Sequence, residues 1–264
     1  MVRELIIGSG DKHMDWFRIK LRNLARRLLT LFILPALRPV IWYTVFYDLI
    51  RQPVLLRYVK TRISLLDQYD AMFPGAKEFS RRTDVHNLAI EVATASGLQG
   101  LWMEFGVWNG ESINHIAKRV KGETIYGFDS FEGLPVDWWQ GRTADALVPK
   151  DYFKCSSLPR VRNNVELIKG WFDQTLPGFL ASHAGPASFI HIDSDVYDSA
   201  KTVLDLLADR IRPGTVIVFD ELFNYPCWEE HEWRALQEFI AARKMSVKYL
   251  AFNSSGEQVA LQFV

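Results

Sequence analysis

The sequence is poor in cysteine, and its cysteines fit no metal or disulfide pattern. Cys155 and Cys227 are the two cysteines among 264 residues, and they match neither a CxxC motif nor a His/Cys metal spacing. We therefore expect no disulfide framework, and a reducing, cytoplasmic location. The chain also lacks net charge, because 31 Lys and Arg residues balance 31 Asp and Glu residues. This balance gives no general argument for a nucleic-acid partner, and we expect none.

The sequence has no uninterrupted apolar run long enough to cross a membrane. The stretch at 28–50, LLTLFILPALRPVIWYTVFYDLI, approaches the length of about 20 apolar residues that a spanning helix needs. Pro35, Arg38, Pro39 and Asp48 interrupt it, so a simple transmembrane helix is not predicted. A secretory signal is not predicted either, because the basic region starts late and no small-residue cleavage site follows.

A basic segment precedes this apolar stretch. Residues 12–27, KHMDWFRIKLRNLARR, carry six Lys and Arg side chains and a single acid, Asp15. Apolar residues recur beside them at roughly helical spacing, as in helices that lie in an anionic membrane interface. One interpretation is therefore peripheral contact with the inner face of a membrane through residues 12–50. The alternative is an arm packed on its own domain or on a second subunit, in line with an expected homo-oligomer, and periodicity does not separate the two.

The chain is predicted to contain two regions. Residues 1–80 are predicted as a helical, basic and apolar N-terminal arm that ends at the turn-like FPGAKE, 73–78. Residues 81–264 are predicted as the main domain. Its first element is a helix from Thr83 or Asp84 to Gly97, since a capping residue precedes apolar positions at helical spacing and a glycine follows them.

Short apolar runs then alternate with helix-length segments, which is typical of βαβ units. Two closing runs, at 246–252 and 257–264, are joined by NSSG and are predicted to form a hairpin. We therefore predict an α/β fold with a doubly wound, mostly parallel seven-stranded sheet, a C-terminal antiparallel hairpin and a helical N-terminal extension. The five runs that precede the hairpin are at 101–106, 124–129, 165–170, 188–193 and 215–220.

The turn after the first of these runs lacks the motifs of dinucleotide and triphosphate sites. MEFGVWNGESI, 103–113, has a GxxxG spacing rather than GxGxxG, and no GK[ST] follows. Gly106 and Gly110 still permit a tight turn, and a helix that starts near Glu111 points free N–H groups at a ligand. Asp129 ends the second run, where an acid commonly accepts hydrogen bonds from ribose hydroxyls. These features predict an adenosine-containing ligand.

Four motifs in order resemble those of a known family. MEFGVWNGESI, TIYGFDSFEGLP, LIKGWFDQTLP and HIDSDVYDS are similar to motifs of class I S-adenosylmethionine-dependent methyltransferases, and more closely to the macrocin O-methyltransferase family. The resemblance covers residues 80–264 and not the N-terminal arm. It implies S-adenosylmethionine as cofactor and a cofactor site at Glu104, Phe105, Gly106, Val107, Gly110, Ser112, Asp129, Ser130, Phe131, Gly170, Trp171 and Phe172.

Within that site the resemblance implies separate roles. Glu104, Gly106 and Gly110 would line the methionine part, and Ser112 would lie near its carboxylate. Asp129 would hold the ribose with Ser130 and Phe131 beside it, whereas residues 170–172 would border the adenine. For Phe105, Trp108 and Phe131 a core position stays an open alternative, because large aromatic side chains often pack inside.

Acids also follow the fourth and fifth runs. Asp193 and Asp220 would meet at one rim of the sheet, with Glu221 adjacent, and three hard oxygen ligands suit Mg²⁺. Asp193 is the expected catalytic residue, accepting the proton of an acceptor hydroxyl, with Asp195 as a substitute ligand or second base. The family has an acid pair after the fifth strand, but Glu221 stands where a shorter Asp or Asn is usual. The alternatives are that Asp193 contacts the cofactor alone and that Asp220 and Glu221 cap a helix or bind arginine.

Other polar and aromatic residues near these acids have two interpretations each. His191 shares a strand face with Asp193 but lies upstream, which favours a core histidine. Residues 224–236, NYPCWEEHEWRAL, supply aromatic side chains for an acceptor pocket or for a buried helix face. Residues 134–145 are typical of a substrate loop, although exposed Trp138 and Trp139 would also suit a subunit contact.

These observations favour one function. We expect an S-adenosylmethionine-dependent O-methyltransferase that acts on a hydroxyl of a sugar, a glycan or another small molecule, with a divalent cation. The alternatives are a metal-independent methyltransferase acting at nitrogen or oxygen, and a non-catalytic adenosine-ligand protein held by its N-terminal arm. A nucleotide-dependent oxidoreductase is disfavoured by the missing GxGxxG motif.

Overall fold

The computed structural model describes residues 53–139 and 147–264. The chain divides into two compact units after Leu56, and the unit from Arg57 to Val264 contains the sheet. Within the described residues, every helix is too short or too polar to cross a membrane. The basic segment at 12–27 and the apolar stretch at 28–50 lie outside the described residues, as does the second half of the predicted substrate loop, 140–145. The helices of the unit are α3 (Pro53–Leu65), α4 (Tyr69–Met72), α5 (Arg82–Ala95), α6 (Glu111–Arg119), α7 (Phe172–Ser182), α8 (Tyr197–Leu206) and α9 (Glu232–Arg243).

Eight strands form one mixed sheet in the order β1-β9-β10-β8-β7-β2-β3-β6. Its core from β8 to β6 is parallel, and β10 runs antiparallel to both β8 and β9. The predicted parallel sheet and C-terminal hairpin are therefore confirmed. The strands are β1 (Lys77–Phe79), β2 (Leu101–Phe105), β3 (Ile125–Asp129), β6 (Val165–Lys169), β7 (Ala187–Ile192), β8 (Val216–Phe219), β9 (Val247–Asn253) and β10 (Val259–Phe263).

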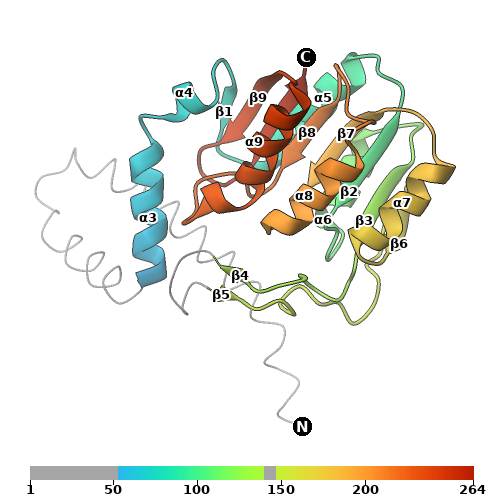
Figure 1. Cartoon of the computed structure of the whole chain (residues 1–264), viewed down its shortest axis with the longest axis horizontal. Coiled ribbons are helices and arrows are strands. Elements are labelled where there is room, and N and C mark those ends of the chain that lie inside the picture. The colour runs from blue at the N-terminus through green and yellow to red at the C-terminus, as the bar shows by residue number, and fades with distance from the viewer. Residues whose placement is uncertain (1–52, 140–146) are drawn as a thin grey trace, which may run out of the picture. The chain divides into compact units, whose positions relative to one another are not determined.

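Helices cover both faces of this sheet, as the predicted doubly wound fold requires. Helices α7, α8 and α9 lie on one face, and α5 and α6 lie on the other (Figure 1). Side chains alternate along each strand, so Met103 packs on the face covered by α7, α8 and α9, and Trp102 packs on the face covered by α5 and α6. Strand β8 shows the same alternation, with Ile217 facing one layer and Val218 the other. Burial on both faces explains why these strands are short, almost continuous apolar runs.

One strand more than predicted is present, because β1 pairs in parallel with β9 at the edge of the sheet. It lies in the segment interpreted as a turn at the end of a helical arm, and its three residues give too short a pattern to reveal a strand. Tyr69 and Phe73, just before it, are buried in the main core. The division after Leu56 thus differs from the predicted boundary at residue 80, since residues 57–80 pack with the sheet.

The strand order reverses between β2 and β7. From β2 the chain crosses to β3 and β6 on one side, and then to β7 and β8 on the other. Ligands of open α/β sheets bind outside the carboxyl ends of the strands at such a reversal. The turn after β2, Asp129 at the end of β3 and Asp193 after β7 are therefore brought to one place.

Candidate active site

The turn after β2 fits tightly against the chain that leaves β7. Gly106 has a φ of +92°, and a Cβ added there would overlap the carbonyl oxygen of Asp193. Gly110, with a φ of +82°, is the N-cap residue of α6 and faces Pro159. Both glycines are thus required by the backbone, the first by close approach as well as by conformation.

Asp129 holds this turn from the next strand. Its Oδ2 accepts hydrogen bonds from the backbone N–H groups of Val107 and Trp108, both at 2.7 Å. Its Oδ1 accepts a further bond from the N–H of Phe131 at 2.6 Å. The side chain predicted to bind ribose therefore also stabilises the turn after β2. Within this turn Trp108 has a φ of +44°, which is uncommon for a residue other than glycine.

A cavity of about 430 Å³ lies at the reversal point. Its size is within the range typical of sites for small molecules and cofactors. One side is made by the turn after β2 and the start of α6, and the opposite side by residues 193–195 and the first turns of α8. Of the predicted site residues, eight line it: Gly106, Val107, Ser112, Asp129, Ser130, Trp171, Phe172 and Asp193.

The remaining predicted cofactor residues lie behind this lining. Phe105 is fully buried and stacks on Phe128, with ring centroids 4.9 Å apart, and Phe131 is buried in the opposite layer. The core alternative for these two aromatic residues therefore agrees with their positions. Gly110 and Gly170 shape the backbone, since both have positive φ angles.

Glu104 is fully buried, and its carboxyl group contacts two neighbouring side chains and does not line the cavity. The Ser112 hydroxyl donates to its Oε1 at 2.8 Å, and Nδ1 of His191 lies 3.1 Å from its Oε2. The other ring nitrogen of His191 lies 3.4 Å from Asp220 Oδ1. Burial lowers the pKa of His191, but Asp220 and Glu104 outweigh it and raise this pKa to about 10. His191 is therefore an imidazolium bridge between two buried carboxylates.

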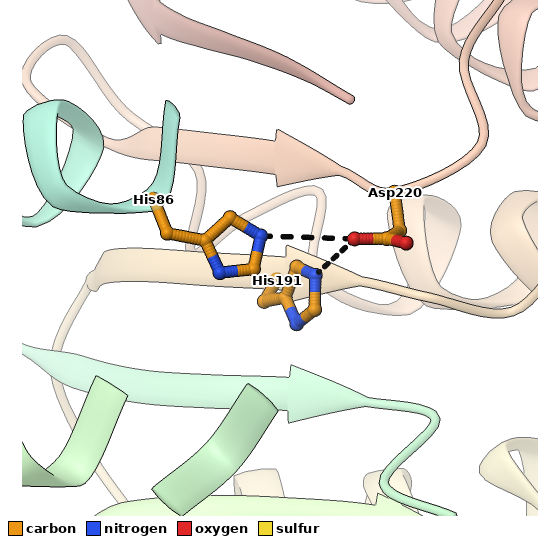
Figure 2. A group of neighbouring side chains, drawn as sticks. All are labelled: His86, His191 and Asp220. Carbon is orange, nitrogen blue, oxygen red and sulfur yellow. Dashed lines mark hydrogen bonds and ion pairs between the residues drawn. The ribbon is translucent and has the colours of Figure 1, made fainter. Parts of the chain in front are cut away.

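Asp220 lies at the centre of a buried group of polar side chains. Figure 2 shows His86 from α5 and His191 from β7, each pointing a ring nitrogen at the same carboxylate oxygen of Asp220. The His86 nitrogen is 3.7 Å away, and burial lowers the pKa of His86 to about 3, so it is neutral. The second oxygen of Asp220 accepts a bond from Gln258 at 3.1 Å.

Arg82 connects this group to the cavity. From the first turn of α5, its Nη2 lies 2.7 Å from Asp193 Oδ2 and its Nε lies 2.7 Å from Asp220 Oδ1. The alternative that Asp220 binds arginine thus agrees with the structure. Burial raises the pKa of Asp220, but Arg82, His191 and His86 outweigh it and hold this pKa well below its usual range. No sequence pattern indicated Arg82 or His86 as site residues, because the packing of α5 against the sheet is a long-range contact.

Asp193, Asp195 and Glu221 form the second acidic group. Carboxylate oxygens of all three lie within 4.8 Å of one another. Burial, and to a smaller extent the neighbouring charge of Asp220, raises the pKa of Asp193 to about 7. Burial likewise raises the pKa of Glu221 well above its usual value, and its buried Oε2 has no hydrogen-bond partner among the described residues. The predicted trio of Asp193, Asp220 and Glu221 is therefore divided, with Asp220 in the Arg82 and histidine group.

The aromatic residues after β8 fall into two sets. Trp228 and Trp233 pack against each other with ring centroids 5.0 Å apart, and Trp233 also contacts Phe73, so both belong to the core. Tyr225 and His231 instead contact Trp138 from the short hairpin of β4 (Trp138–Trp139) and β5 (Leu147–Val148). Trp138 is only 5% exposed, which corrects the expectation that it is an exposed side chain.

Comparisons with known proteins agree with this geometry. Residues 103–222 match the family model described as a methyltransferase domain. A relative from Streptomyces olivaceus, an 8-demethyl-8-(2,3-dimethoxy-alpha-L-rhamnosyl)-tetracenomycin-C 4'-O-methyltransferase, is 29% identical over 173 residues. This match covers 58% of the chain and 65% of the relative, so the chain spans slightly less than two thirds of that protein's length.

A solved structure shares the fold. The calicheamicin methyltransferase CalS11 superposes with a TM-score of 0.51 at 20% sequence identity, over 75% of this chain and 84% of CalS11. At this identity the likeness concerns the fold alone. The match over residues 103–222 covers slightly less than half of the chain and agrees with the predicted resemblance to class I methyltransferases.

Proposed function

We propose that the protein is an S-adenosylmethionine-dependent O-methyltransferase that methylates a hydroxyl of a sugar or of another small hydroxylated molecule. The observation that carries this proposal is a single cavity that has the glycine turn and Asp129 on one side and Asp193 and Asp195 on the other. The named activity of the relative, methyl transfer to an oxygen of a rhamnosyl compound, supports the same reaction class.

The cofactor would occupy the side of the cavity formed by the turn. Its amino-acid end suits the N-terminus of α6, where backbone N–H groups and Ser112 face the cavity. Asp129 keeps acceptor capacity for ribose hydroxyls, since a carboxylate has about four lone-pair positions and three are used. Trp171 and Phe172 would border the adenine.

Asp193 is proposed as the general base. Methyl transfer from a sulfonium needs an aligned and deprotonated hydroxyl, and a base with a pKa near neutrality performs this well. The carboxylate lines the cavity, and Arg82 fixes one of its oxygens. The other oxygen faces the acceptor hydroxyl, either as its base or as a ligand of a cation that activates it.

The oxygen donors fit a hard divalent cation at Asp193, Asp195 and Glu221. Their oxygens converge, and the partnerless Oε2 of Glu221 is a buried acceptor that such an ion would satisfy. Asp220 fits less well, because Arg82, His191 and Gln258 already occupy its oxygens. A bound Mg²⁺ would supply Lewis-acid polarisation of the acceptor oxygen.

Calorimetry with S-adenosylmethionine and S-adenosylhomocysteine tests the cofactor assignment. We expect both to bind, and the absence of binding by either would refute the methyltransferase proposal. Asp193→Asn is expected to keep cofactor binding while turnover falls by about 10²- to 10⁴-fold. Asp209→Asn is the matched control, because Asp209 is exposed and pairs with Arg243 on the surface.

Titration of Mg²⁺ tests the cation assignment separately. We expect Glu221→Gln to weaken Mg²⁺ binding measured by calorimetry and to leave S-adenosylhomocysteine binding unchanged. Full turnover of chelator-treated enzyme would contradict the cation assignment and favour a metal-independent methyltransferase.

A further inference from the structure

Arg82 is a half-buried cation that contacts two of the acids that follow the strands. Its Nη2 donates to Oδ2 of Asp193, after β7, at 2.7 Å, and its Nε lies 2.7 Å from Oδ1 of Asp220, after β8. The second contact is an ion pair without hydrogen-bond geometry, since Nε has no hydrogen-bond partner within residues 53–139 and 147–264. Arg82 therefore acts on Asp220 through its charge rather than through a directed N–H group.

The two carboxylates need a positive charge between them. Carboxylates that are removed from water are costly unless a cation pairs with them. A hard divalent ion binds such oxygens and usually keeps water in its remaining positions. A guanidinium serves the same electrostatic purpose, because it is always charged in proteins and presents several N–H groups. Arg82 thus supplies from the chain itself the charge that a bound ion would otherwise bring to Asp193 and Asp220.

Arg82 also stands between the cavity and Asp220. The arginine side chain is 35% exposed and lines the 430 Å³ cavity, as does Asp193. The Asp220 side chain is 5% exposed and does not line it. Helix α5 brings a second side chain to the same carboxylate, since His86 follows Arg82 by one helical turn and lies 3.7 Å from Asp220 Oδ1. An ion that enters the cavity therefore meets Arg82 before it can reach Asp220.

We propose that Arg82 is a built-in substitute for a divalent cation between Asp193 and Asp220. This inference rests on the proposed function, because it explains how the acids beside the proposed methyl-transfer site are neutralised. Arg82 contacts Asp193 through one oxygen, so the other oxygen stays available to the second acidic group, with Asp195 and Glu221. Removing the guanidinium charge should therefore open an additional Mg²⁺ site at Asp193 and Asp220.

Arg82→Gln tests this role, because it removes the charge and keeps a polar side chain. Arg82→Lys keeps the charge, and Arg81→Gln is the matched control, since Arg81 is exposed and pairs with Asp84. Mg²⁺ affinity is measured by calorimetry, and the unfolding temperature is recorded with and without Mg²⁺. Binding of S-adenosylhomocysteine is measured in parallel for every variant.

We expect Arg82→Gln to gain Mg²⁺ affinity by about tenfold or more, because a unit positive charge beside the ion is lost. Mg²⁺ should also raise its unfolding temperature more than that of the unaltered protein, even where loss of the arginine destabilises the fold. The gain should persist when Glu221→Gln is added and disappear when Asp220→Asn is added. Arg82→Lys and Arg81→Gln should bind Mg²⁺ as the unaltered protein does.

Three results would overturn the inference. The first is an unchanged Mg²⁺ affinity of Arg82→Gln together with an unchanged effect of Mg²⁺ on its unfolding temperature. The second is an equal gain in Arg82→Lys, and the third is loss of the gain when Glu221→Gln is added, because the ion would then bind at the second acidic group alone. Failure of the unaltered protein to bind S-adenosylhomocysteine would instead refute the proposed function itself.

Discussion

At the scale of single residues, Gly106 determines how closely the turn after β2 approaches the chain that leaves β7. Its missing side chain leaves room for the carbonyl oxygen of Asp193, the proposed base. Any Cβ would push the cofactor turn away from that residue. The position of the methyl donor relative to the base therefore depends on one absent carbon atom.

Gly106→Ala is expected to lower stability by about 1–3 kcal/mol and to weaken cofactor binding, because strain and a backbone clash are combined. Gly122→Ala is the matched control, since Gly122 has a similar φ of +84° and no atom within 4 Å of the added Cβ. Chemical unfolding and calorimetry with S-adenosylhomocysteine measure the two effects. Equal losses in both variants would show that backbone strain alone, and not the contact with Asp193, matters.

His191 links the cofactor side of the site to the acids. Replacing it with Leu leaves Glu104 and Asp220 buried without their shared cation, and we expect a loss of about 3–5 kcal/mol in the free energy of unfolding. In the double variant Glu104→Gln with His191→Leu, the loss should be smaller than the sum of the single losses. Additive losses in denaturant unfolding would mean that the two side chains do not interact.

Sequence reasoning was successful for residues whose position follows from a strand end. Asp129 and Asp193 were each predicted at the end of a strand, where ligands of parallel sheets bind, and both line the cavity. Glu104 was expected to line the methionine part of the cofactor, but its side chain points to His191 within the sheet. The direction of a strand residue depends on which face its neighbours fill, and that is decided by packing across the sheet.

At the scale of elements, the segment before α5 extends the core. Phe73 is 1% exposed and contacts Phe223, which follows β8, and Tyr249 and Phe252 of β9. Arg62 of α3 donates to the carbonyl oxygens of Asn224 and Ser255 and pairs with Glu257. These contacts explain why β1 is held at the sheet edge although it has only three residues.

Phe73→Ala should therefore cost about 3–5 kcal/mol, the range for a large aromatic side chain removed from a core. Leu66→Ala is the control, because Leu66 is 57% exposed on the same segment and should change stability by less than about 0.5 kcal/mol. Thermal unfolding of the full chain measures both. A similar small change in the two variants would mean that residues 57–80 are dispensable for the core, as the predicted boundary at residue 80 implies.

The predicted helices and strands of the main domain match their observed bounds closely, because short apolar runs and helix-length segments alternate regularly there. The run at 101–106 became Leu101–Phe105, and the helix predicted from Thr83 begins at Arg82. The β4–β5 hairpin was not predicted, since two-residue strands carry no period. Its pairing depends on the loop around it rather than on an apolar pattern.

At the scale of the whole molecule, the basic segment at 12–27 lies outside the described residues, and membrane contact through it stays a prediction. We expect the full chain to float with vesicles that contain anionic lipid and not with neutral vesicles, because each Lys or Arg near an anionic surface contributes about 1 kcal/mol. Replacing Lys12, Arg18, Lys20, Arg22, Arg26 and Arg27 by Gln should abolish flotation. Equal flotation with both lipids, or none with either, would favour packing or oligomerisation.

The hydrogen bonds that Asp129 accepts from the turn after β2 also affect how the proposed cofactor binds. Because the carboxylate already fixes the N–H groups of Val107 and Trp108, the turn holds its shape before any ligand arrives. Little conformational entropy is then left to lose on binding, and the bound and free turns should exchange amide hydrogens at similar rates. Association would be limited by diffusion into the cavity rather than by folding of the loop.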